Sequence, residues 1–119
     1  MDTKLTKIIQ KAAGIDIGAE QIFISVAGQE VQSFNTFTLG YARAIEYLKR
    51  YSIETVAMEA TGIYWVSLYE MIEQAGIKVY LVNGAHVKNV PGRKSDVKDC
   101  QWIQQLHSYG LLRASFYSR

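Results

Sequence analysis

Cysteine and proline are scarce in this chain, and long hydrophobic runs are absent. The 119 residues contain one cysteine, Cys100, so no internal disulfide can form, and one proline, Pro91. No Ser/Gly-rich stretch indicates an internal linker. No segment reaches the roughly 18 apolar residues that span a bilayer, and the charged segment Met1–Lys11 lacks the apolar core of a secretion signal. We therefore expect one cytoplasmic domain without a membrane partner.

A large excess of charge of one sign is also lacking. Thirteen Lys and Arg residues and eleven Asp and Glu residues give a net charge of +2, which by itself indicates no nucleic-acid partner. Hydrophobic residues make up 49% of the chain and charged residues 20%, the balance of a globular protein rather than a disordered one. A chain of this size buries about 65% of its unfolded surface, which is enough for a core without disulfides or zinc.

Three strands are expected near the N-terminus. The apolar run Ala12–Ile17 ends at Gly18 and predicts a buried strand, and Ile22–Val26 predicts a second. Gly28 suits a tight turn before a third strand, Glu30–Thr36. The short connections predict an antiparallel arrangement, because parallel neighbours need a crossover of about a dozen residues or more.

Apolar residues at helical spacing predict three helices in the rest of the chain. The second begins at the capping residue Thr61 and ends before Gly76, and the third begins at Ser95 and ends at Gly110. In chain order, the apolar faces contain Tyr41, Ile45 and Leu48; Tyr64, Leu68, Met71, Ile72 and Ala75; and Val97, Cys100, Ile103 and Leu106.

Two more strands, Thr55–Met58 and Ile77–Val82, lie between these helices. Right-handed crossovers place both of them parallel to the first strand. The expected fold is therefore α/β, with a mixed five-stranded sheet whose first three strands are antiparallel and with helices on both faces. Ligands bind open sheets of this kind beyond the carboxyl ends of strands, where Asp16 and Glu59 are expected.

Four acids lie in three short motifs. Asp16 ends a strand within a Gly-x-Asp-x-Gly motif, Glu59 follows the fourth strand, and Asp96 and Asp99 lie one turn apart on the last helix. The helix dipole also favours acids in first turns, so the Asp96 and Asp99 pair alone does not indicate a site. Gly-x-Asp-x-Gly also occurs in sugar-kinase and actin-like ATPases, but the chain contains no second phosphate-binding loop.

The four acids require a cation if the fold brings them together. Two carboxylates about 5 Å apart at an effective dielectric of about 20 repel each other by roughly 3 kcal/mol. Mg²⁺ or Mn²⁺ converts this repulsion into coordination, because hard cations prefer carboxylate oxygens. Two such ions can activate a water molecule or hydroxyl and stabilise the leaving oxygen of a phosphodiester. The acids therefore indicate metal-dependent chemistry on phosphates.

A basic segment precedes and overlaps the last two acids. Lys88, Arg93, Lys94 and Lys98 can neutralise the phosphates of a nucleic-acid strand. Taken alone, this segment fits a solvated loop better, but beside a site for phosphate chemistry it indicates contacts with a nucleic-acid backbone.

Other aromatic and titratable residues are interpreted mainly as packing residues. Trp102 and His107 fit packing better than catalysis, and Cys100 fits a small buried hydrophobe. Of Tyr64 and Trp65, one is expected in the core, and the other can stack on a base.

Three stretches resemble the N-terminal domain of the insertion-sequence-110 transposases, the DEDD recombinases related to the pilin-gene invertases. They are Ala13–Gly18, Met58–Trp65 and a long, very specific stretch from Val79 to Trp102. The resemblance spans nearly the whole chain and implies a RuvC-like domain of the RNase H-like fold.

The resemblance also implies a site and partners. The DEDD tetrad of the family falls on Asp16, Glu59, Asp96 and Asp99, which are implied to be the catalytic and metal-binding residues, with Mg²⁺ or Mn²⁺ as the cofactor. The family cuts and rejoins DNA to move its element, and some members use an element-encoded guide RNA that this domain helps to hold. The expected partners are therefore DNA, a guide RNA in some members, and further copies of the chain in a homo-oligomer.

Three functions are compatible with these features. The leading hypothesis is the metal-dependent catalytic domain of a DNA transposase. The alternatives are a stand-alone RuvC-like junction nuclease and a non-catalytic module for nucleic-acid binding or dimerisation. Family members also carry a C-terminal domain with a serine implicated in attack on DNA, and nothing in residues 1–119 matches it. We therefore expect this chain to be the RuvC-like domain alone, without complete recombination activity.

Overall fold

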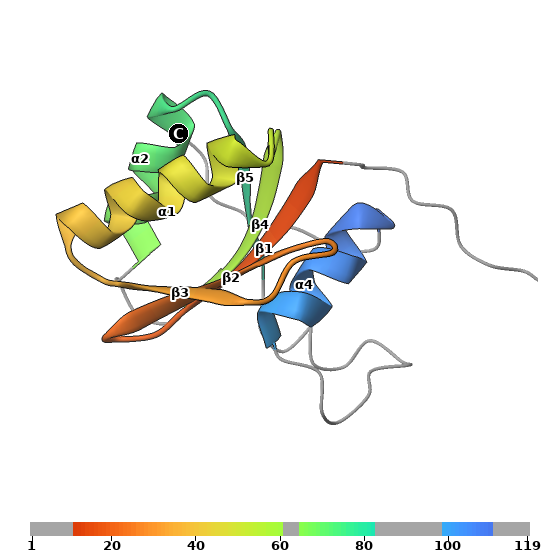
Figure 1. Ribbon diagram of the computed structural model, residues 1–119, viewed down its shortest axis with the longest axis horizontal. Coiled ribbons are helices and arrows are strands. Elements are labelled where there is room, and N and C mark those ends of the chain that lie inside the picture. The colour runs from red at the N-terminus through yellow and green to blue at the C-terminus, as the bar shows by residue number, and fades with distance from the viewer. Residues whose placement is uncertain (1–10, 61–64, 83–98, 111–119) are drawn as a thin grey trace, which may run out of the picture.

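A mixed five-stranded sheet with helices on both faces forms the described part of the chain (Figure 1). The computed structural model describes residues 11–60, 65–82 and 99–110. The strands are β1 (Ala12–Ile17), β2 (Gln21–Val26), β3 (Gln32–Asn35), β4 (Thr55–Ala60) and β5 (Lys78–Val82). Their order across the sheet is β3-β2-β1-β4-β5, with β2 antiparallel to β1 and β3, and β4 parallel to β1 and β5. The predicted mixed sheet is confirmed.

In the described part of the chain, three helices cover this sheet. Helices α1 (Thr38–Arg50) and α2 (Trp65–Gln74) lie on one face, and α4 (Asp99–Ser108) lies on the other (Figure 1). All three occur where apolar spacing predicts a helix, although the predicted starts at Thr61 and Ser95 lie outside the described residues. Over residues 11–60, 65–82 and 99–110, no helix is long and apolar enough to cross a bilayer.

The third strand is shorter than the predicted Glu30–Thr36, since only Gln32–Asn35 form it. The Asn35 side chain accepts a hydrogen bond from the Phe37 N–H at 3.0 Å, and the Thr36 hydroxyl donates one to a main-chain carbonyl of the β1–β2 turn at 2.9 Å. These side-chain bonds take the place of further strand pairing, so the chain leaves the sheet early and enters α1.

The two faces of the sheet are packed differently. The larger apolar cluster lies beneath α1 and α2 and includes Ile15 and Ile17 of β1 together with Leu48 and Leu68 of the helices. The smaller cluster lies beneath α4 and contains Ala57, Val82, Trp102, Ile103 and Leu106. Because side chains alternate along a strand, the residues of β1 between the large aliphatic ones face α4.

The ends of α1 and α2 share one hydrogen-bonding pattern, in which the chain reverses at a residue with positive φ. After α2 this residue is Gly76, with φ 87°, as the sequence predicts, and the Ile77 N–H bonds to the Ile72 carbonyl at 3.2 Å. After α1 the same position is Ser52, with φ 56°, and the Ile53 N–H bonds to the Leu48 carbonyl at 3.0 Å. Ser52 therefore carries backbone strain that a glycine would avoid.

Replacing Ser52 with glycine is expected to raise the free energy of unfolding by about 0.5–1 kcal/mol, because glycine adopts positive φ without a Cβ penalty. Urea unfolding followed by circular dichroism measures the change. Gly76→Ala is the reciprocal control and is expected to lower stability by about 1 kcal/mol. An unchanged or lowered stability of Ser52→Gly would contradict this account of the α1 end.

A buried hydrogen bond holds the C-terminal part of α4 against the sheet. His107 is 4% exposed, its Nε2 lies 3.0 Å from the Thr55 hydroxyl, and its ring lies 5.2 Å from that of Tyr80. Burial lowers the pKa of His107 from 6.5 to about 4. The imidazole is therefore neutral at pH 7, which confirms His107 as a packing residue.

The free energy of unfolding is expected to fall as the pH drops from 6.5 toward 4. In this range the unfolded chain binds a proton at residue 107 and the folded chain does not. The contribution of His107 to the free energy of unfolding is therefore fully present above pH 6.5 and is lost as the pH falls. Between pH 7.5 and 4.5 it amounts to about 2–3 kcal/mol. Urea unfolding at both pH values should show a smaller loss for His107→Gln, which can still bond to Thr55 but does not titrate. Equal losses in the two proteins would refute the assignment.

Candidate active site

Asp16 and Glu59 are direct neighbours across two parallel strands. Asp16 of β1 is the register partner of Glu59 of β4, and their side chains share the face covered by α4. Glu59 is 8% exposed and Asp16 is partly buried. Neighbouring strands lie about 4.8 Å apart, so the two carboxylates emerge side by side near the carboxyl end of both strands. The strand β4 continues through Glu59, past its predicted end at Met58.

The position of α4 depends on a glycine beneath it. Gly14 lies two residues before Asp16 and faces the helix, and a Cβ added there would overlap the carbonyl oxygen of Cys100 and the backbone of Gln104. Helix backbone therefore rests directly on strand backbone, with no side chain between them. Cys100 is 1% exposed, which confirms it as a small buried residue.

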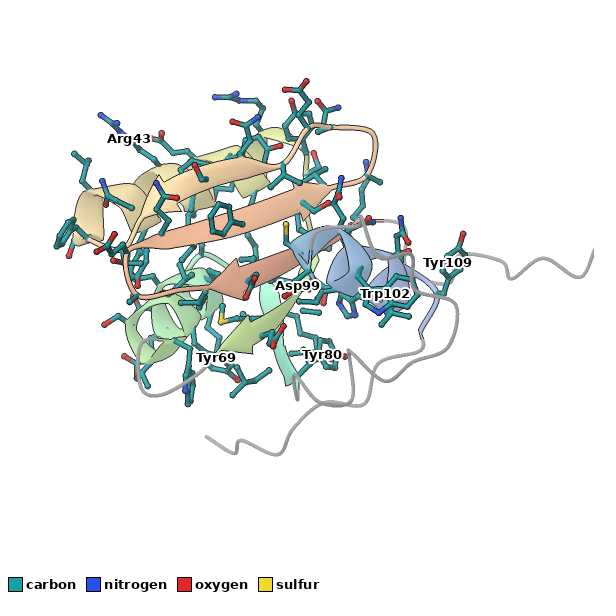
Figure 2. All side chains as sticks on the ribbon, turned by 90° about the horizontal axis from the view of Figure 1, so that it is seen from below. Arg43, Tyr69, Tyr80, Asp99, Trp102 and Tyr109 are labelled. Atoms are coloured by element: carbon teal, nitrogen blue, oxygen red, sulfur yellow. The ribbon has the colours of Figure 1, made fainter. Side chains whose placement is uncertain are left out.

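The direction of α4 brings Asp99 to the level of the other two acids. His107 lies at Thr55, near the start of β4, and Asp99 lies eight residues earlier in the helix. Those eight residues span about 12 Å, and the four residues from Thr55 to Glu59 span about 13 Å. Asp99 therefore lies near the height of Glu59. Figure 2 shows Asp99 at the end of α4 nearest the arrowheads of β1 and β4.

The structure places three of the four predicted acids at one end of one sheet face. The fourth, Asp96, lies outside the described residues, as do the predicted nucleic-acid-binding residues Lys88, Arg93, Lys94 and Lys98. Within the described segments, no three His, Cys, Asp or Glu side chains lie close enough together to hold a metal ion. The described site is therefore a carboxylate pair, Asp16 and Glu59, with Asp99 on the neighbouring helix.

Two aromatic predictions are also resolved. Trp102 is 8% exposed and packs in the apolar cluster beneath α4, as predicted. Trp65 is half-buried against the larger cluster and stacks edge-on with Tyr69 at 5.7 Å, so it is the core member of the predicted pair, and Tyr64 lies outside the described residues. The role of Gly14 was not predicted from the sequence, because it depends on which element crosses β1.

The fold matches that of a solved structure. The structure of T. thermophilus RuvC in complex with a Holliday junction substrate superposes on this chain with a TM-score of 0.63 and 18% sequence identity, covering 87% of this chain and 98% of that one. The similarity defines a RuvC-like domain of the RNase H-like class, as the sequence predicted. No curated protein sequence matches the chain significantly.

The sequence then defines the family. Residues 13–117 match the model of the IS110 DEDD family, whose description is transposase, and the chain belongs to this family. The predicted general function is thereby confirmed at the level of the family: the chain is a transposase domain.

Gly14→Ala is expected to push α4 away from β1 and to move Asp99 relative to Asp16 and Glu59. Displacing a group that orients a site typically weakens function or metal affinity by about 10–100-fold. Mn²⁺ titration by calorimetry and DNA cleavage assays measure the loss. Gly28→Ala is the matched control: Gly28 has φ 82° in a turn with open space around it, so the variant should lose stability but keep ion affinity. Equal ion affinity of Gly14→Ala and the unaltered protein would contradict this role.

Proposed function

We propose that Asp16, Glu59 and Asp99, together with Asp96, hold Mg²⁺ or Mn²⁺ and cut DNA phosphodiesters during transposition. The observation that carries this proposal is the register pairing of Asp16 with Glu59 on the face where α4 presents Asp99. Glu59 is 8% exposed and lies beside a second carboxylate, an arrangement in which a bound cation would relieve the repulsion between two like charges.

The donor set fits a hard divalent cation. All the proposed ligands are carboxylates, and Mg²⁺ binds one or two carboxylates while keeping several of its own water molecules. A bound ion would supply Lewis acidity toward a phosphate oxygen and a more acidic water molecule. Asp16 and Glu59 would bind on the rigid sheet, and Asp99 would bind from the first described turn of α4, where the helix dipole favours a negative charge.

The wider interactions are also part of this proposal. Lys88, Arg93, Lys94 and Lys98 would contact the DNA backbone through charge-assisted hydrogen bonds. Assembly as a homo-oligomer and, in the manner of some family members, use of an element-encoded guide RNA are proposed from the family alone. A second candidate activity, cleavage of four-way junctions, is suggested by the solved RuvC complex.

Calorimetric titration with Mn²⁺ tests the site directly. Asp16→Asn, Glu59→Gln and Asp99→Asn are each expected to weaken ion binding by more than about tenfold, because each removes a charged oxygen ligand. The control is Glu46→Gln, since Glu46 is an exposed acid on α1 across the sheet. Ion binding that is unchanged in all three site variants would refute the proposal.

The same variants separate the possible functions when they are assayed on DNA. Mg²⁺-dependent cutting of DNA from the element's ends, lost in Asp16→Asn, supports transposase chemistry. Cutting restricted to four-way junctions would instead favour the junction nuclease. Salt-sensitive DNA binding without cutting, unaffected by loss of the acids, would identify a non-catalytic binding module.

A further inference from the structure

An exposed phenylalanine lies directly beside the carboxylate pair. Phe23 of β2 is the antiparallel register partner of Asp16, so Glu59, Asp16 and Phe23 form one row across three strands on the α4 face. Directly opposed residues of this kind have Cα atoms about 5 Å apart. Phe23 is 37% exposed and belongs to neither apolar cluster of the described residues. Within the described residues, neither apolar cluster therefore accounts for the position of its ring at the site.

Within the described residues, helix α4 covers the sheet up to the level of this row. Ser25, two residues along β2 on the same face, pairs with Gly14 under the helix and is 3% exposed. Beyond it, Phe23 and Gln21 on β2 and Ser33, the partner of Phe23 on β3, are exposed. These three side chains carry no charge, so they do not repel phosphates. Among the described residues, a strip of exposed side chains thus leads from the acids toward the β3 edge of the face that Figure 2 views.

We infer that Phe23 stacks on an unpaired base of the DNA strand next to the phosphodiester held at Asp16 and Glu59. The inference rests on the proposed function for the position of that phosphodiester. An aromatic ring is a stacking platform that accepts any base, since every base has a π-face. A nucleotide adjoining the phosphate at Asp16 reaches the next strand, where Phe23 offers an exposed ring.

This geometry selects a class of substrate. A base inside a continuous duplex is already stacked on both sides, so it must leave the stack before it can contact Phe23. That step costs least for a base that is mismatched or already single-stranded. The domain is therefore expected to prefer DNA with an unpaired nucleotide beside the cut over a fully paired duplex of the same sequence.

The exposed phenylalanines of the chain provide a matched comparison. Phe37 is 73% exposed, more than Phe23, but it lies at the start of α1 on the opposite face. An effect that came only from removing an exposed aromatic ring would appear in Phe37→Ala as well as in Phe23→Ala. Phe23→Trp keeps a stacking surface, and Phe23→Leu keeps an apolar side chain without one.

The first experiment measures affinity for a forked DNA with splayed single strands and for the matching duplex. Fluorescence anisotropy is used with Ca²⁺ in place of Mg²⁺, and again in EDTA. The unaltered protein, Phe37→Ala and Phe23→Trp should prefer the fork. Phe23→Ala and Phe23→Leu should lose about 5- to 100-fold in fork affinity with little change for the duplex. Equal losses on both DNAs, or the same loss in Phe37→Ala, would overturn the inference.

The second experiment locates the contact. 2-Aminopurine placed at successive positions around the fork should be quenched by the unaltered protein at one position and not by Phe23→Ala. An abasic nucleotide at that position should remove the difference in affinity between the two proteins. If the ring stacks on that base, removing either one abolishes the same contact, so removing both costs no more than removing one. Additive losses from Phe23→Ala and the abasic site would count against stacking.

Two controls separate this inference from the proposed metal site. Mn²⁺ titration of Phe23→Ala should match the unaltered protein, and its thermal unfolding should show that it is folded. If Mn²⁺ fails to bind the unaltered protein, the proposed metal site fails, while the fork preference in EDTA still tests Phe23. If the acid variants lose ion binding but Phe23→Ala binds the fork normally, the metal site stands and the role of Phe23 is refuted.

Discussion

The direct contact between the backbone of α4 and Gly14 is the constraint on which the site depends. A helix usually packs on a sheet through side chains, but here a Cβ at Gly14 would overlap the helix main chain. The absence of a side chain lets α4 lie close to β1. At the other end of the helix, His107 and Thr55 fix its position along the strands. Together these two contacts set the height at which Asp99 meets the sheet.

The two sheet faces differ in the kind of side chain that they bury. The α1 and α2 face carries the larger apolar cluster, with fully buried Ile15, Leu48 and Leu68. The α4 face has a smaller cluster and includes buried polar groups such as Ser25 and His107. Apolar burial beneath α1 and α2 therefore offsets the cost of placing carboxylates and a neutral histidine on the other face.

The row from Glu59 through Asp16 to Phe23 combines residues that suit the reaction of the family with a residue that the strand register places beside them. Membership of a transposase family gives the reaction class, and the register gives the order of the side chains across the strands. Two neighbouring carboxylates suit a cation and a phosphate, whereas an exposed ring suits a base. A nucleotide presents both chemical groups, so one strand of DNA can contact the whole row.

The sequence by itself determined the elements, because alternating and helical apolar spacing, short turns and glycine stops are local signals. Gly76 and Gly110 were recognised in this way, whereas Ser52 was not, since its positive φ follows from how the chain leaves α1. The acids could be named from their motifs and from a family resemblance. Their positions relative to one another could not be predicted, because these positions depend on long-range contacts.

Only the tertiary structure decided which acids are neighbours and which face they share. The pairing of β1 with β4 set Asp16 beside Glu59, and strand alternation turned both toward α4. The antiparallel pairing of β1 with β2 set Phe23 next to Asp16. In the sequence, Phe23 reads as an ordinary strand hydrophobe. A slip of one residue in the pairing register would move every side chain of a strand to the opposite face. Local sequence signals alone therefore could not specify this arrangement.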